Sequence, residues 1–214
     1  MKRKASDYSL RVHISGDAWF THEHGRVPCS SESFDAMKTF MQKVRPTPNP
    51  YRPSTNILRR QCAFLLDTAP VSSYKFGQDQ DSFRVSSDVP SLITDVLSFS
   101  KGEGYEYDLV QANYYEHGGV GISPHQDNEP CIDLSVPIMS ISFMERATEA
   151  RPFSFYTTQN QRLLDVHLGH GDVLVMGQGI QEHVKHGVEK DRPNFYGPRI
   201  NLTLRKTKEN RSGV

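Results

Sequence analysis

The stretch "RINLTLR", residues 199–205, alternates polar and apolar side chains without interruption. Side chains on a β-strand point to opposite faces in turn, so this pattern predicts a strand with one polar and one aliphatic face. The polar face consists of Arg199, Asn201, Thr203 and Arg205, and the aliphatic face of Ile200, Leu202 and Leu204. The aliphatic face suits an ordinary core, and we expect the polar face to be turned inward as well.

Two arginines turned inward need anionic partners, because burying an unpaired guanidinium is costly. One interpretation is a pair of internal salt bridges from Arg199 and Arg205 to Asp or Glu. The other is a bound dicarboxylate with one arginine for each carboxylate, since the guanidinium fork matches carboxylate geometry. A five-carbon diacid that also chelates iron fits the second interpretation.

The half of the chain that leads to this strand is rich in short β-type runs separated by Gly, Asn or charged turns. These runs are "YDLVQANYY", "PIMSISFM", "PFSFYT", "DVHLG", "DVLVMG" and "EHVKHGV". Many short strands with turns between them indicate a sandwich or a barrel. Helices are expected earlier, at residues 30–44 and 88–100, short strands at 61–66 and 72–77, and a proline-rich loop at 45–54. The class is therefore α+β with a β-rich catalytic half.

The composition of the 214 residues is that of a globular protein, with 36% hydrophobic and 23% charged residues and a formal net charge of zero. No apolar run approaches the length of a membrane-spanning helix, and the first residues lack the apolar core of a signal peptide. Cys29, Cys62 and Cys131 are odd in number and irregularly spaced. We interpret them as free thiols and expect a cytoplasmic monomer, without excluding the nucleus.

Charge is unevenly distributed along the chain. Residues 1–60 carry eleven Lys and Arg against five Asp and Glu, a net charge of +6. A basic segment suits a polyanionic partner such as a nucleic acid. A solvated surface of mixed charge is the alternative.

A second motif, His125-x-Asp127, lies in "NYYEHGGVGISPHQDNEPC", residues 113–131. On a strand these two side chains share a face, and a distant histidine would complete the two-histidine, one-carboxylate triad of non-haem Fe(II) oxygenases. "EHVKHGV" offers His183 and His186, which would face opposite sides of a strand, and we prefer His186. His22 and His24 form another possible pair, but we favour ordinary surface or turn histidines there.

Together these motifs resemble the AlkB family of Fe(II)/2-oxoglutarate dioxygenases across residues 55–206. The resemblance rests on N-x-Y at residues 113–115, H-x-D at 125–127, the histidine of "KHGV" and R-x-N-x-T-x-R at 199–205. "HQDNEPC" and "MGQGIQEHVKHGV" look like the AlkB domains of plant RNA-virus replicases. The family implies a double-stranded β-helix (jelly roll) core, N-terminal helices and a nucleotide-recognition lid around residues 55–105. We expect an N-terminal extension with a helix and a Pro-rich loop at 1–54, and a basic tail at 207–214.

The resemblance also implies roles for individual residues. Iron would be bound by His125, Asp127 and His186, and 2-oxoglutarate by Asn113, Tyr115, Arg199, Asn201 and Arg205. Glu129 corresponds to an acidic residue beside the substrate base, and Tyr74 to a tyrosine of the lid. A rim salt bridge and a buried aromatic are the alternative interpretations of these two residues.

The implied reaction is oxidative removal of methyl groups from N1-methyladenine or N3-methylcytosine in single-stranded nucleic acid, RNA favoured over DNA, with Fe(II), 2-oxoglutarate and dioxygen. His125 itself would lie on one side of the flipped base. Phe64 and Phe76 are candidates for the other side, while Trp19 is expected in the core. Two alternatives remain: an oxygenase that hydroxylates a protein side chain or small molecule, and a binding module that has lost catalysis.

Overall fold

The computed structural model describes residues 11–49, 51–75, 80–86, 88–145 and 149–209. Part of the predicted basic N-terminal segment (residues 2–4), Phe76 and residues 210–214 of the predicted tail lie outside these ranges.

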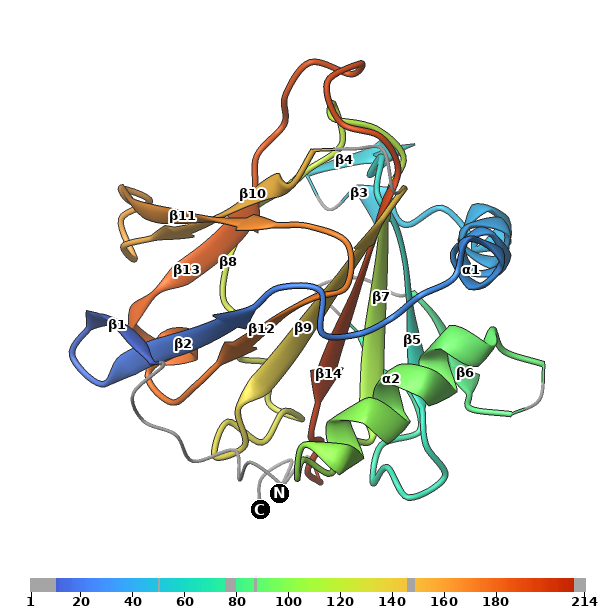
Figure 1. Cartoon of the computed structure of the whole chain (residues 1–214), viewed down its shortest axis with the longest axis horizontal. Helices are drawn as coiled ribbons and strands as arrows, with labels where there is room; N and C mark the ends of the chain where they lie inside the picture. The colour runs from blue at the N-terminus through green and yellow to red at the C-terminus, as the bar shows by residue number, and fades with distance from the viewer. Residues whose placement is uncertain (1–10, 50, 76–79, 87, 146–148, 210–214) are drawn as a thin grey trace.

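Two β-sheets face one another and form the jelly-roll core (Figure 1). The major sheet has, in spatial order, β1 (Val12–Ser15), β2 (Ala18–Glu23), β12 (Asp172–Met176), β9 (Ile138–Met144), β14 (Arg199–Arg205), β7 (Leu109–Tyr115), β5 (Arg60–Leu65) and β6 (Asp81–Arg84). The minor sheet has β11 (Arg162–Leu168), β10 (Arg151–Tyr156), β13 (Lys185–Val188) and β8 (Ile122–His125). From β7 onward the chain passes repeatedly between the two sheets, as in a jelly roll.

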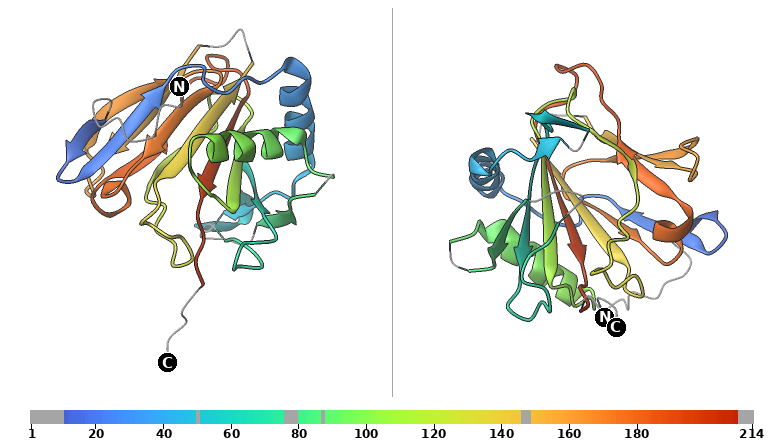
Figure 2. Two further views of the ribbon diagram at one scale, coloured as in Figure 1. Left: turned by 60° about the horizontal axis from the view of Figure 1, so that its bottom comes forward. Right: turned by 180° about the vertical axis from the view of Figure 1, so that it is seen from behind.

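Apolar side chains pack on both faces of the major sheet. Between the two sheets, Phe20 of β2 and Phe155 of β10 stack with ring centroids 5.1 Å apart. On the outer face, Ile200, Leu202 and Leu204 belong to a second buried cluster, so the predicted aliphatic face of β14 is confirmed. Helices α1 (Ser31–Lys43) and α2 (Ser91–Gly102) cover this outer face, and Figure 2 shows both on one side of the molecule.

The two predicted helices are confirmed with small shifts at their ends. Ser30 is the N-cap of α1, and its side chain accepts a hydrogen bond from the backbone N–H of Ser33. Phe34, Met37 and Met41 form the buried face of α1. Pro90 is the N-cap of α2 rather than a residue of its first turn.

Three local predictions were wrong. Residues 45–54 are not a plain loop, because β3 (Pro48–Asn49) and β4 (Arg52–Asn56) pair as a two-stranded ribbon. Proline is tolerated there because a ribbon does not need every backbone N–H for a central ladder. Residues 72–75 are irregular instead of extended. "EHVKHGV" is split between a short helix, α3 (Ile180–His183), and β13.

Two elements that precede position 55, β2 and α1, pack with the rest of the fold. Strand β2 pairs antiparallel with β12, which lies about 150 residues later in the chain, and α1 packs on the sheet. None of the described helices has the length and apolar character needed to cross a membrane.

Candidate active site

His125, Asp127 and His186 lie together at one end of the minor sheet. His125 ends β8 and is the register partner of His186 on β13, and their ring centroids are 4.4 Å apart. The Nε2 atoms of the two histidines lie 3.6 and 3.8 Å from the two carboxylate oxygens of Asp127. One ligand atom from each residue lies within 4.8 Å of the other two, which is close enough for all three to hold one metal ion.

His183 does not join this group. It ends helix α3, and its Nε2 lies 3.4 Å from a carboxylate oxygen of Asp17. The preference for His186 over His183 therefore agrees with the positions of the two rings. The argument from strand parity was wrong, because the turn of helix between Ile180 and His183 sets where His183 points.

The electrostatics of the three side chains suit metal binding. Burial lowers the pKa of His186 to about 3 and also lowers that of His125, so both rings are neutral at pH 7 and offer a nitrogen lone pair. Burial alone would raise the pKa of Asp127, but the guanidinium of Arg205, 2.6 Å away, holds it well below its usual range. Asp127 is therefore an anion between two neutral imidazoles.

The polar face of β14 is buried, as predicted, and faces matching residues of β7. Arg199 is the register partner of Tyr115, and Asn201 is the partner of Asn113. These residues are the ones expected to bind 2-oxoglutarate, together with Arg205 at the far end of the strand. The sheet thus places all five expected residues on one buried face.

Arg199 has buried hydrogen-bond donors that a bound ligand could use. Its Nη2 donates to the hydroxyl of Ser142 at 2.8 Å, and its guanidinium lies 5.2 Å from the ring centre of Tyr115. Its Nε and Nη1 are buried without a hydrogen-bond partner among the described residues, and burial lowers its pKa to about 10. No carboxylate of the described residues pairs with Arg199, so the carboxylate of a bound diacid fits this position.

Arg59 also lies in the site, although it was not predicted from the sequence. It is buried, and its Nε donates to the side-chain oxygen of Asn113 at 2.7 Å while its Nη2 donates to Gln61. Burial lowers its pKa. Arg59 immediately precedes β5, and Gln61 is the second residue of that strand. Side chains two positions apart in an extended chain share a face, so this spacing could have indicated that both point inward.

A cavity of about 640 Å³ opens beside His125, one of the three side chains that could hold a metal ion. Its walls include the β3–β4 ribbon, the segment 121–125 that ends in His125, and residues 188–190 after β13. Arg59 and Gln61 also line it. Tyr51 and Leu58 also line the cavity. Both are large apolar side chains that are open to solvent, with 92% and 65% of their surface exposed.

Tyr74 and Glu129 lie close to Arg205 and are not among the residues that line this cavity. Tyr74 is buried, and its hydroxyl accepts a hydrogen bond from Nη1 of Arg205 at 3.2 Å. Burial raises the pKa of Glu129, an effect that Arg205 opposes.

Of the two residues considered for stacking on a base, Phe64 lies away from the cavity and Phe76 lies outside the described residues. Phe64 is fully buried between Phe40 and Phe83 in the outer core, so that suggestion was wrong. Trp19 is buried in the same cluster, as expected.

Comparison with known proteins agrees with this geometry. The family model described as the 2OG-Fe(II) oxygenase superfamily matches residues 25–205. The DNA oxidative demethylase ALKBH2 of Bos taurus is 29% identical over 122 residues, which make up 53% of this chain and 41% of that protein. The human protein of the same name is 29% identical over 109 residues, or 48% of this chain and 41% of that protein. The matched region thus spans less than half the length of these curated relatives.

A solved structure, described as the structure of OsALKBH1, shares the fold. It superposes with a TM-score of 0.55 at 15% identity, over 92% of this chain and 99% of the other. The chain belongs to the 2OG-Fe(II) oxygenase superfamily, whose chemistry uses Fe(II), 2-oxoglutarate and dioxygen, and it is similar in sequence and fold to proteins of the AlkB type.

Proposed function

We propose that this chain removes methyl groups from N-methylated bases in nucleic acid by oxidative demethylation, with N1-methyladenine and N3-methylcytosine as preferred bases. The observation that carries the proposal is the position of His125. This residue belongs to the group of three metal-ligating side chains and also lines the cavity of about 640 Å³. A methyl group presented in the cavity would therefore lie beside the metal centre.

In this proposal His125, Asp127 and His186 bind iron, and Asn113, Tyr115, Arg199, Asn201 and Arg205 bind 2-oxoglutarate. When bound, iron, 2-oxoglutarate and dioxygen supply the oxidation: one oxygen atom enters a C–H bond of the N-methyl group, and the other converts 2-oxoglutarate to succinate and carbon dioxide. The hydroxymethyl product then loses formaldehyde and leaves the unmethylated base.

The protein's own groups position the reactants and hold charge. His125 and His186 stay neutral because burial lowers the pKa of each, while Arg205 keeps Asp127 ionised. Arg199 would bind one carboxylate of 2-oxoglutarate through the donors that have no partner among the described residues. Arg59 would hold the side chain of Asn113 in place through its 2.7 Å hydrogen bond.

The walls of the cavity support a nucleic-acid substrate. Tyr51 offers an exposed ring on which a base could stack, and stacking on aromatic side chains is common to proteins that bind single strands. An unpaired strand is favoured because the target base must leave any duplex before it reaches the metal. Glu129 does not line the cavity, and its negative charge would favour a cationic methylated base from a distance.

RNA is proposed to be accepted at least as well as DNA. The support is the resemblance of "HQDNEPC" and "MGQGIQEHVKHGV" to the AlkB domains of plant RNA-virus replicases. The curated relatives carry the name DNA oxidative demethylase, so both polymers belong in the test. We further propose that the chain acts as a monomer in the cytoplasm.

The deciding experiment measures formaldehyde release from methylated oligonucleotides, with RNA, DNA, single strands and duplexes compared. A panel of peptides and small molecules is included to test hydroxylation. We expect iron- and 2-oxoglutarate-dependent release from single strands, weakening as salt is added because phosphate contacts are screened. Hydroxylation of a peptide or small molecule, with no release from any oligonucleotide, would refute the proposal and favour the alternative oxygenase function.

A further inference from the structure

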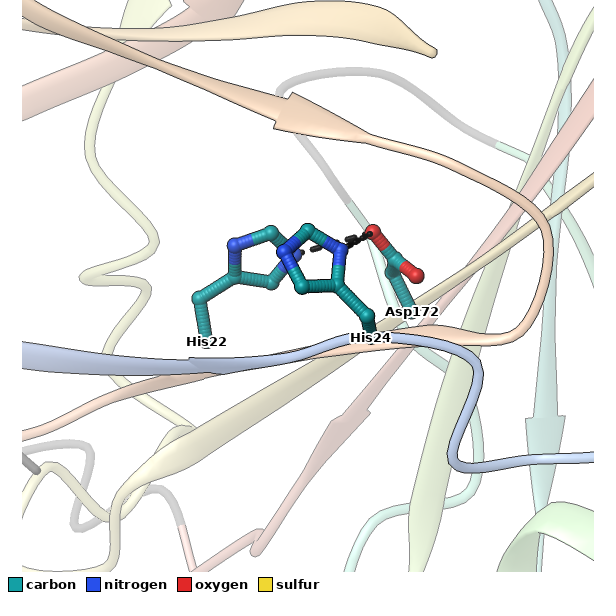
Figure 3. A group of neighbouring side chains, drawn as sticks. All are labelled: His22, His24 and Asp172. Atoms are coloured by element: carbon teal, nitrogen blue, oxygen red, sulfur yellow. Dashed lines mark hydrogen bonds and ion pairs between the residues drawn. The ribbon is translucent and has the colours of Figure 1, made fainter.

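A second group of metal-ligating side chains lies apart from the active site, at the junction of β2 and β12. It consists of His22, His24 and Asp172 (Figure 3). The Nε2 of His22 lies 2.9 Å from Oδ2 of Asp172, and the Nδ1 of His24 lies 3.1 Å from the same oxygen. The two rings have centroids 4.2 Å apart and meet edge to face.

Strand pairing brings these residues together. β2 and β12 are antiparallel neighbours in which Glu23 is the partner of Val173, and this register places Asp172 beside the end of β2. His22 is the last-but-one residue of β2, and His24 lies two positions further on, so both can reach the start of β12.

Asp172 is held in place before any ligand arrives. It is buried, its Oδ1 accepts a hydrogen bond from the backbone N–H of Gly25 at 2.8 Å, and its Oδ2 accepts one from Gly169 at 2.9 Å. Burial alone would raise the pKa of Asp172, yet these backbone amides and His22 lower it below its ordinary value. A fixed, ionised carboxylate therefore faces two imidazole nitrogens.

We infer that His22, His24 and Asp172 form a binding site for a divalent transition metal of the Zn²⁺ type, separate from the iron site. Two imidazoles and a carboxylate are a common zinc donor set with an open fourth position. Bonds of about 2.0–2.1 Å in a tetrahedron separate neighbouring ligand atoms by about 3.3 Å, close to the distances found here. His24 has 80% of its side chain exposed, so an ion and a water ligand can reach the group from solvent.

The alternative is a hydrogen-bonded cluster without metal. In that case Oδ2 of Asp172 would accept three donors at once, from His22, His24 and Gly169. An oxygen has two lone pairs in the plane of a carboxylate, so three donors crowd it. A metal ion removes the crowding, because the rings then donate lone pairs to the ion.

The test counts zinc bound per chain in metal-stripped protein, by competition with a chromophoric chelator. The wild type should bind two equivalents, while His22→Gln, His24→Gln and His186→Ala should each bind one. A double variant, His24→Gln with His186→Ala, should bind none. His167→Gln, which changes an exposed histidine of β11, should still bind two.

Thermal unfolding gives a second readout that does not depend on activity. Zinc should raise the Tm of His186→Ala, and the added substitution His24→Gln should abolish that rise. His24 is largely exposed, so its replacement leaves the fold intact even if His22→Gln does not fold. A wild type that binds one equivalent, or a His24→Gln variant that still binds two, would overturn the inference and leave a hydrogen-bonded cluster. Neither outcome bears on demethylation.

Discussion

The Nη2 of Arg205 lies 2.6 Å from a carboxylate oxygen of Asp127, whereas Arg199, six residues earlier on the same face of β14, has no carboxylate partner among the described residues. Arg205 thus already makes an internal salt bridge and keeps its buried Nε for a ligand, whereas Arg199 makes no such bridge among the described residues. Arg205 neutralises the carboxylate of Asp127, whereas Nε and Nη1 of Arg199 have no hydrogen-bond partner among the described residues. Substitutions of the two should therefore have different side effects.

Replacing either Arg199 or Arg205 by Lys should raise the 2-oxoglutarate concentration needed for half-maximal turnover by more than about tenfold. Lysine offers a point charge where the fork made paired hydrogen bonds, each worth roughly 1.5–3 kcal/mol to a charged group. Only Arg205→Lys should also weaken Fe(II) binding, because Asp127 loses its partner. If neither variant needs more 2-oxoglutarate, the two arginines have a structural role and do not bind the cosubstrate. Arg162→Lys, on exposed β11, is the control and should not change the 2-oxoglutarate requirement.

Metal ligation predicts a sharp contrast between two neighbouring histidines. His186→Ala, like His125→Ala or Asp127→Ala, should abolish conversion of 2-oxoglutarate to succinate, while His183→Ala should retain substantial activity. The reason is that the ring of His183 lies beside Asp17 at the end of α3. Succinate is measured by mass spectrometry. An inactive His183→Ala beside an active His186→Ala would show that the ligand assignment is wrong.

The charge of Glu129 should determine the preference between cationic and neutral bases. Glu129→Gln should reduce kcat/KM for N1-methyladenine by roughly tenfold relative to a neutral base such as N3-methyluracil, because the variant loses about 1.4 kcal/mol of attraction between the carboxylate and the cationic base. Competition between the two substrates in one reaction gives the ratio directly. If the ratio of the two kcat/KM values does not change, Glu129 only balances the charge of Arg205 and does not select the base.

The contact between Gly177 and Trp19 should limit what position 177 can hold. A Cβ at Gly177 would lie 1.9 Å from the ring of Trp19, so Gly177→Ala should reduce the free energy of unfolding by about 1–3 kcal/mol. Gly102→Ala is the matched control, because a Cβ there meets nothing within 4 Å at the end of α2. Chemical denaturation of both variants tests this, and an equally stable Gly177→Ala would contradict the packing of Trp19.

Periodicity explains which parts of this fold could be predicted from the sequence. The alternation of residues 199–205 fixes both faces of β14, and the capped amphipathic pattern of residues 30–44 predicts α1. These patterns are local, so they need no knowledge of the rest of the chain. His125 and Asp127 do lie together, but β8 ends at His125, so strand alternation does not explain why they meet.

Long-range pairing explains what could not be predicted. Nothing local in β2 indicates that it lies beside β12, so the cluster of His22, His24 and Asp172 was not foreseen. Arg59 was missed because its partner Asn113 lies 54 residues away. His183 was placed on a strand because a single helical turn is too short to show a period.

Strand β8 is the outermost strand of the minor sheet, and β13 is its only partner among the strands that the structure describes. An outermost strand is ordinarily the first to fray, yet this one ends in a metal-ligating histidine whose register partner is a second such histidine. An ion bound by both histidines would therefore cross-link β8 to β13 and stabilise this edge of the sheet. The backbone amides of Ile122, Ser123 and His125 should then exchange with deuterated water more slowly in the metal-loaded protein. Metal binding would thus order this wall of the cavity before any base binds.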